Sequence, residues 1–234
     1  MTYGDIDLRP VATLDDTARG DFVIRVYQHL LAAIAVFVGI ETIFLNTPIA
    51  EGIYDFVAGS GVTWLLILGG FMAGQWIVAN AAADLLNPQK QYAALFGSAA
   101  LYAVLFAPML HYTFRASSNG GTTVAAAALI TAIAFAGLTV VAFVTRTDLS
   151  FLRPVVMYGF VLSFALIIAA VVFGFGLGVW FSLAMVALSG MAILYQTQTV
   201  IRQYPAAAHV AAALGLFSSV MTMFWYVLRL LSRR

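Results

Sequence analysis

Long apolar runs alternate with short polar breaks along the chain, which is the pattern of a helical membrane protein. A membrane-spanning helix needs about 20 mostly apolar residues, and seven runs reach that length. The predicted spans are 23–45, 62–83, 92–114, 122–145, 154–173, 177–196 and 206–228. The sequence therefore predicts an all-α membrane protein with seven transmembrane helices.

The least obvious division falls within residues 154–196, which form one apolar block. This block is too long for one span and about right for two. The sequence FGFGLG at 173–178 supplies the break, because glycine adopts the backbone angles of a tight turn. Pro154 stands where a helix can begin without losing a needed N–H group. We therefore expect two helices joined by a glycine-rich turn.

Residues 1–21 differ from the rest, because they contain five Asp residues and no apolar core. This composition predicts a solvated cytoplasmic tail rather than a cleavable signal peptide, so the first span would act as the targeting signal. No later segment is long and polar enough to be a linker. Residues 22–231 are therefore expected to form one transmembrane domain.

The composition identifies an integral membrane protein. The chain is 63% hydrophobic and 9% charged, whereas soluble domains contain about 25% charged residues. So few charges cannot build a water-facing surface. The formal net charge of +1 argues against nucleic acid as a partner, which leaves the lipid bilayer as the expected surrounding.

Basic residues predict the orientation, because short cytoplasmic loops are rich in Lys and Arg. With the N-terminus inside, Arg115 is the one basic residue of the outer loops. Seven full spans then place the basic C-terminal end outside, against this rule. If one segment instead re-entered the membrane without crossing it, that end would lie inside. We expect seven spans and a cytoplasmic N-terminus.

Glu41, in VGIETIF near the outer end of the first span, is the most suggestive ionisable residue. A charge at the centre of a spanning helix costs about 2.5–3.5 kcal/mol on insertion scales, so such residues are functional candidates by default. Glu41 could hold a cation or a proton at the outer mouth of a pore. Alternatively, it is an interfacial carboxylate that reaches water or pairs with Arg115.

Small residues at four-residue steps predict close helix packing in two spans. The stripes are Gly70 and Gly74 in the second span, and Ala207, Ala211, Gly215 and Ser219 in the last. Such stripes are more typical of packing than of chemistry.

Signatures of membrane enzymes are missing from the sequence. It has no HExxH motif, no GxSxG motif, no paired intramembrane Asp and no cysteine. The single lysine, Lys90, lies in a predicted loop, which excludes the Schiff base of a retinal protein. We therefore expect no enzymatic activity, no cofactor and no resident metal centre.

A polar cluster, YQTQT at 195–199, ends the sixth span. The chain turns near 204–206, and residues equally far from a hairpin turn lie at similar depth. Gln196 and Ser219 are nearly equidistant from this turn. They could therefore face one another, with Thr222 further along the same helix.

The polar cluster also lies in a segment that resembles a known family. ILYQTQTVI resembles the signature LYDTQ-I that ends helix 6 of the Bax inhibitor-1 (transmembrane Bax inhibitor motif) family. VIRVYQHLLAAIAV, VAFVTRTDLSFL and AALGLFSSVMTMFWYVLRLL are similar to the first helix, the loop between helices 4 and 5, and the last helix of that family. The resemblance covers residues 22–231.

This resemblance implies seven helices with the seventh at the centre. It also implies a pH-sensitive calcium leak in several members, survival roles in eukaryotes and a link to membrane proteolysis in some bacterial members. In leak-forming members, two aspartates share a proton, since neighbouring carboxylates raise one pKa. Here those positions hold Gln196 and Ser219, which do not titrate. Calcium should bind weakly there, because hard cations prefer carboxylate oxygens.

Two functions stay open from the sequence. The first is a cation (Ca²⁺) leak with Glu41 at the outer mouth and Gln196, Ser219 and Thr222 at the inner side. The second is a non-conducting regulator of membrane protein quality control or stress survival. Such a regulator would bind another membrane protein, for example a membrane protease. The missing aspartates favour the second function. The form of the resemblance suggests a bacterial inner membrane. A small-molecule transporter has little support.

Overall fold

The computed structural model describes residues 8–116 and 118–233, and these fold into a bundle of helices. Seven helices are long and apolar enough to cross a membrane, which confirms the predicted fold class. They are α1 (Asp16–Leu45), α3 (Gly61–Ala82), α4 (Pro88–Ala116), α5 (Gly120–Val144), α6 (Leu152–Phe173), α7 (Val179–Arg202) and α8 (His209–Leu231). Two shorter elements are η2 (Val11–Thr13) and α2 (Pro48–Ala58).

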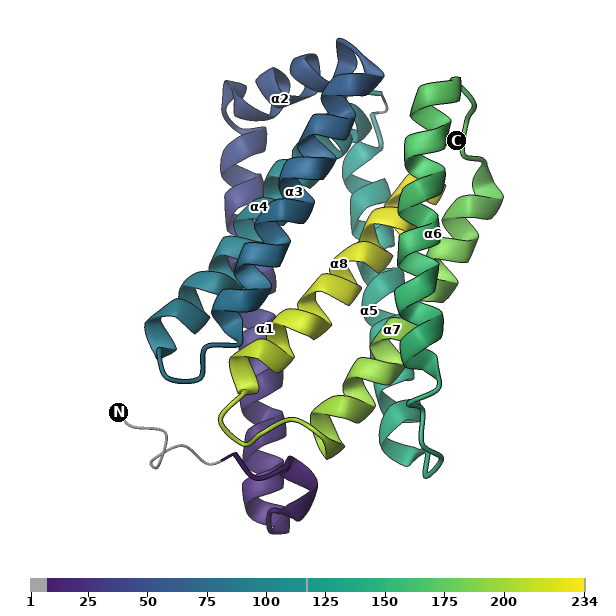
Figure 1. Ribbon diagram of the computed structural model, residues 1–234. Coiled ribbons are helices and arrows are strands. Elements are labelled where there is room, and N and C mark those ends of the chain that lie inside the picture. The colour runs from purple at the N-terminus through teal and green to yellow at the C-terminus, as the bar shows by residue number, and fades with distance from the viewer. Residues whose placement is uncertain (1–7, 117, 234) are drawn as a thin grey trace.

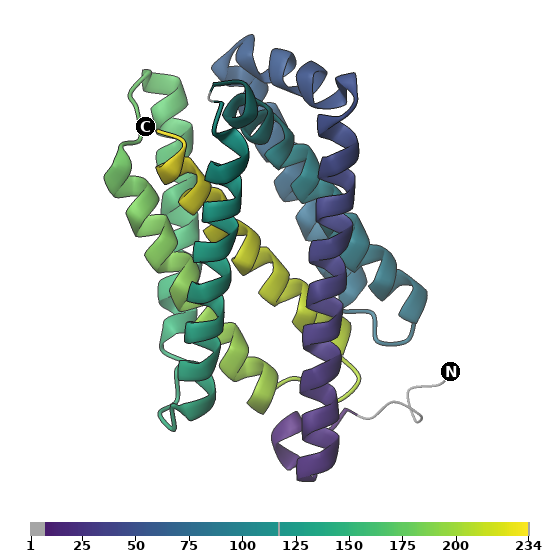
Figure 2. The same cartoon turned by 180° about the vertical axis from the view of Figure 1, so that it is seen from behind.

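Helix α8 crosses the bundle diagonally between two groups of helices, α1, α3 and α4 on one side and α5, α6 and α7 on the other (Figures 1 and 2). In its most apolar stretch 67% of the residues are buried, against 0% in α3 and in α6. Small residues such as Ala212 and Ala213 let neighbouring backbones approach, while Phe217 fills the core between them. The last spanning helix is therefore the central one, as predicted.

Some helices extend beyond the predicted spans. The sixth span was predicted to end at Gln196, but α7 continues through the polar residues to Arg202. Thr199 remains helical and donates its hydroxyl to the carbonyl oxygen of Tyr195 at 2.9 Å. The difference arises because hydropathy locates the hydrocarbon core, whereas a helix ends where its backbone hydrogen bonds end.

Helix α2 is an element that the hydropathy pattern did not predict. Its 11 residues are too few to span a membrane. Pro48 occupies its first turn, where no N–H group is needed. The helix lies across the end of the bundle between α1 and α3 (Figure 1).

Most of residues 8–21 are exposed, as expected for a solvated tail, but specific contacts fix this segment and α1 begins within it. Asp15 caps α1 by accepting the N–H of Ala18 at 2.7 Å, so α1 already begins at Asp16. Val11 is fully buried, and its N–H donates to the carbonyl oxygen of Tyr204 at 2.9 Å. The N–H of Ala206 donates to the carbonyl oxygen of Arg9 at 3.1 Å. The segment 8–14 is thus fastened to the α7–α8 turn; residues 1–7 lie outside the described part.

Glycines behave differently at the predicted turn and at the predicted stripe. Gly174 ends α6 with φ 71°, a left-handed conformation that suits glycine. A Cβ at Gly74 would lie 2.8 Å from the Leu101 side chain, so α3 and α4 pack closely there. Gly70 faces open space. The packing role predicted for Gly70 is therefore wrong, because only one of the two glycines faces a neighbouring helix.

A substitution at Gly120 tests how tightly α4 and α5 are connected. A Cβ there would lie 2.5 Å from the carbonyl oxygen of Thr113 and 2.7 Å from the Cα of Phe114. Because backbone must move, Gly120→Ala is expected to lower the free energy of unfolding by about 1–3 kcal/mol. Gly137→Ala, in open space on the same helix, is the control and should be neutral or stabilising. Thermal unfolding in detergent measures both variants, and equal midpoints would contradict the expectation.

Candidate functional site

The site begins with a hydrogen bond between the two helices that meet at the α7–α8 turn. The hydroxyl of Ser219 donates to Oε1 of Gln196 at 3.1 Å. Ser219 is buried and Gln196 half-buried. The structure therefore brings together the two side chains that the equal-depth argument placed opposite each other. Neither side chain is ionisable.

Gly215 and Tyr204 continue the site toward the α7–α8 turn. A Cβ at Gly215 would lie 3.6 Å from Oε1 of Gln196 and 3.8 Å from the hydroxyl of Tyr204. Gly215 therefore lies on the face of α8 that meets Gln196 and Tyr204, at ordinary van der Waals distances. Ala211, one turn further, is packed on the core. Burial raises the pKa of the Tyr204 phenol. Tyr204 therefore stays neutral at physiological pH.

Thr222 and Tyr102 extend the polar groups in the other direction along α8. Both hydroxyls donate to the carbonyl oxygen of Ser218, at 2.8 Å from Thr222 and 3.1 Å from Tyr102. Tyr102 comes from α4, so it ties that helix to the centre of α8. The backbone oxygen is satisfied by these hydroxyls, which follows the rule that buried polar groups find partners.

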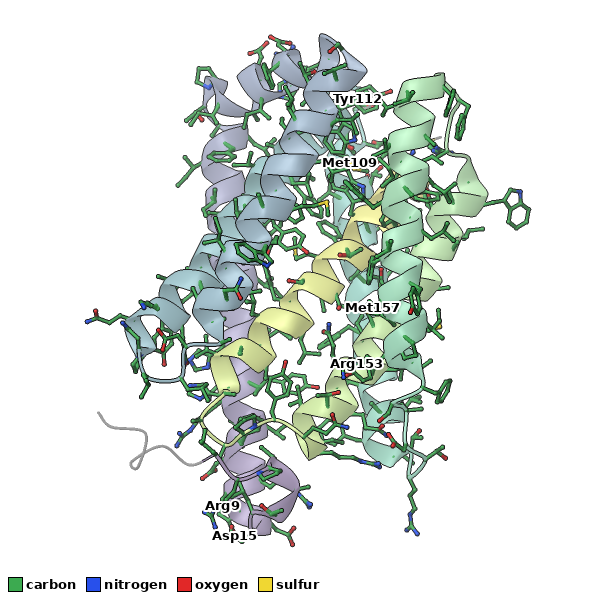
Figure 3. The ribbon with its side chains drawn as sticks, in the orientation of Figure 1. Arg9, Asp15, Met109, Tyr112, Arg153 and Met157 are labelled. Carbon is green, nitrogen blue, oxygen red and sulfur yellow. The ribbon has the colours of Figure 1, made fainter. Side chains whose placement is uncertain are left out.

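A cavity of about 930 Å³ begins at Tyr102 and Thr222. Its walls come from α2, α3, α4, α6, α7 and α8, and its far end carries Arg229 and Arg233. Two wall residues of α4, Met109 and Tyr112, are labelled in Figure 3. Among the described residues that line it, none is acidic. The Gln196–Ser219 contact therefore lies beyond the inner end of an electropositive cavity.

Glu41 is not part of this group. It is only 4% exposed and does not line the cavity, and neither carboxylate oxygen has a hydrogen-bond partner. Arg115, the alternative partner, instead pairs with Glu51 at 2.9 Å. Glu41 therefore faces the protein interior rather than water, and its part in an ion path stays a prediction. Glu41 faces the protein interior because it lies on the same face of α1 as the buried residues Leu30, Ala33 and Phe37.

Gln198 is a structural residue that the sequence analysis did not single out. Its Oε1 accepts the N–H of Leu149 at 2.6 Å, and its Nε2 donates to the carbonyl oxygen of Thr147 at 2.8 Å. It therefore holds the α5–α6 loop. The spacing of Gln196 and Gln198 could have indicated this role, since residues two positions apart in a helix face opposite sides. Gln196 and Gln198 must serve different neighbours.

The α5–α6 loop has a further polar anchor. Asp148 accepts the N–H of Ser150 at 2.9 Å and its hydroxyl at 2.5 Å. The Ser150 hydroxyl holds the pKa of Asp148 below its usual range. This carboxylate is thus committed to loop structure rather than to the site.

Comparison with known proteins decides the family. A sequence profile of the family described as "Inhibitor of apoptosis-promoting Bax1" matches residues 19–234, nearly the whole chain. The chain belongs to the Bax inhibitor-1 family. The chain is also 31% identical over 117 residues to an uncharacterized protein of Pseudomonas aeruginosa. That match covers 48% of this chain and 50% of the relative, so it spans about half the length of the relative.

Metal binding at the centre of this Bax inhibitor-1 family member would depend on neutral oxygens. The available ligands are the Gln196 amide, the Ser219 hydroxyl and the Tyr204 phenol. Among the described residues no cluster of three or more His, Asp or Glu could hold a metal ion. Calcium sites use several carboxylate or carbonyl oxygens. The arrangement is better suited to holding α7 and α8 together than to holding a cation.

The Gln196–Ser219 bond can be measured through stability. Ser219→Ala is expected to lower the free energy of unfolding by about 1 kcal/mol, because the half-buried amide oxygen of Gln196 loses its donor. Ser189→Ala is the control, since Ser189 is also buried but its hydroxyl donates within α7 to Met185 at 2.7 Å. Chemical unfolding in mixed micelles compares them. A Ser219→Ala change no larger than that of the control would mean that the contact contributes nothing.

Proposed function

We propose that this Bax inhibitor-1 family protein is a non-conducting regulator that binds another membrane protein. The observation that carries the proposal is the charge of the cavity next to the central contact. Arg229 and Arg233 line it, and no acidic side chain does so among the described residues. The family position for a titratable pair holds the neutral Gln196–Ser219 contact.

Electrostatics supports this proposal over a leak. Two unit charges 4 Å apart interact by about 4 kcal/mol near a protein surface, and a divalent ion doubles this. A calcium ion entering the cavity would meet two guanidinium groups and then neutral oxygens. Neither the guanidinium groups nor these few neutral oxygens would replace the water ligands that the calcium ion loses on entry.

The N-terminal segment supports a regulatory role. Residues 8–14 are fastened to Tyr204, whose hydroxyl lies beside Gly215 and Gln196. Asp15, Asp16 and Asp21 are exposed next to this segment, and Arg9 and Asp15 are labelled at that end of the molecule in Figure 3. A partner that pulls on the segment would act directly on the α7–α8 turn. We infer a cytoplasmic N-terminus in a bacterial inner membrane and a partner such as a membrane protease.

A cation leak is the second candidate, and Glu41 is the observation that favours it. A buried carboxylate without a hydrogen-bond partner is costly inside a membrane. Such a group is retained more readily when it holds a proton or a cation. In this case Glu41, away from the cavity, would attract the ion.

Calcium flux separates the two functions. Proteoliposomes with the wild-type protein are expected to take up no Ca²⁺ between about pH 6 and 8. Gln196→Asp/Ser219→Asp should take up Ca²⁺ in a pH-dependent way, because two adjacent carboxylates share a proton and ionise in separate steps. Gln196→Asn/Ser219→Thr is the neutral control. Wild-type uptake that Glu41→Gln abolishes would overturn the regulator and establish the leak.

Val11 tests whether the N-terminal segment is coupled to the turn. Val11→Asp buries a charge, so the segment should undock and the backbone amides of residues 11 and 206 should exchange at least about tenfold faster. Leu8→Asp is the control, since Leu8 is 49% exposed. Hydrogen–deuterium exchange reads both variants. Unchanged exchange in Val11→Asp would contradict the docking of the segment.

A further inference from the structure

The cavity has the length of one leaflet's hydrocarbon. It follows α8 from Thr222 to Arg233, and this stretch of helix rises about 16 Å. The hydrocarbon core of a bilayer is about 30 Å thick, so each leaflet contributes about 15 Å. One acyl chain of a leaflet therefore matches the length of the cavity along α8.

The walls of the cavity are suited to an apolar chain. Trp64 of α3 and Trp225 of α8 stack with ring centroids 5.8 Å apart, and both face the cavity. Phe71, Phe106 and Phe160 add aromatic surface from three different helices. The volume of about 930 Å³ falls within the usual range of ligand pockets, about 300–1,000 Å³.

The cavity reaches the surface of the protein at its edge. Met72 on α3 is 43% exposed, Tyr112 on α4 is 50% exposed, and Phe175 after α6 is 47% exposed. All three also line the cavity. A chain that lies in the membrane can therefore enter between α3 and α6 without crossing the protein.

The C-terminal end of the cavity is cationic. Arg229 and Arg233 both donate an Nη2 proton to the carbonyl oxygen of Leu177, at 3.4 and 2.7 Å. A guanidinium has five N–H donors, so each arginine keeps donors for an additional acceptor. With no acidic lining residue in the described part of the chain, these charges are not neutralised within the cavity.

The geometry points to a binding site for a phospholipid with an anionic headgroup. Its acyl chain would lie along α8 between Trp64, Trp225 and Thr222, and its phosphate would accept hydrogen bonds from Arg229 and Arg233. Arginine pairs well with phosphate because its planar fork matches two oxygens. The site accounts for two arginines on the side of the membrane where loops are otherwise poor in positive charge. It does not depend on whether the protein conducts ions.

Tryptophan fluorescence tests this site directly. The parent variant Trp76→Phe/Trp180→Phe removes the two exposed tryptophans and leaves Trp64 and Trp225 as reporters. It is reconstituted in vesicles with trace lipids whose chains carry bromine, a quencher. Brominated phosphatidylglycerol is expected to quench with about tenfold higher apparent affinity than brominated phosphatidylcholine, because its net negative charge is not offset by a choline cation beside the two arginines.

Matched variants assign this preference to the cavity. Arg229→Gln/Arg233→Gln in the parent should reduce the preference to about onefold. Arg115→Gln should keep it, since Arg115 lies on the same side of the bundle but pairs with Glu51. Ser163→Phe, which fills the cavity from α6, should weaken quenching by both lipids. Arg229→Lys/Arg233→Lys keeps the charge, so it should retain part of the preference and serves if the Gln variant does not fold.

Two results would overturn the site. One is equal quenching of the parent by phosphatidylglycerol and phosphatidylcholine. The other is a preference that persists in a folded Arg229→Gln/Arg233→Gln protein, which would assign both arginines to the α6–α7 turn alone. Neither result would affect the calcium-flux test, because that test depends on Gln196 and Ser219.

Discussion

The burial of α8 within the bundle is the constraint on which the rest of the structure depends. A central helix cannot direct its polar groups to water, so each must be satisfied by its own backbone or by neighbouring helices. The Ser219 hydroxyl donates a hydrogen bond to Gln196 of α7, and the Ser218 carbonyl oxygen accepts one from Tyr102 of α4. These bonds connect α8 to both groups of helices.

The central contact stands where the family resemblance implies a titratable pair, and it consists of neutral groups. Gln196 and Ser219 hold α7 and α8 together by a hydrogen bond that does not depend on pH. Control would then come from a mechanical element, the segment 8–14 that is bonded to Tyr204 below the contact. A neutral pair with a docked segment is compatible with a regulator that responds to a partner rather than to protons.

The charge of the cavity and the charge of Glu41 lie in different places. Arg229 and Arg233 occupy the C-terminal end of the cavity, whereas Glu41 is buried on α1 outside it. The arginines that would hold an anionic lipid and the carboxylate that would attract a cation therefore lie in different parts of the molecule. This separation is why lipid binding and ion conduction can be tested independently.

The sequence by itself determined the seven spans, the central last helix and the facing of Gln196 and Ser219. The first follows from the thickness of the hydrocarbon core, the second from the family resemblance, and the third from the geometry of a hairpin of known length. Only the tertiary structure decided the docking of Val11, the side of α3 that packs and the burial of Glu41. The same holds for the cavity, whose walls come from six helices. These features join residues far apart in the chain, and hydropathy records how apolar a segment is but not which neighbour each face meets.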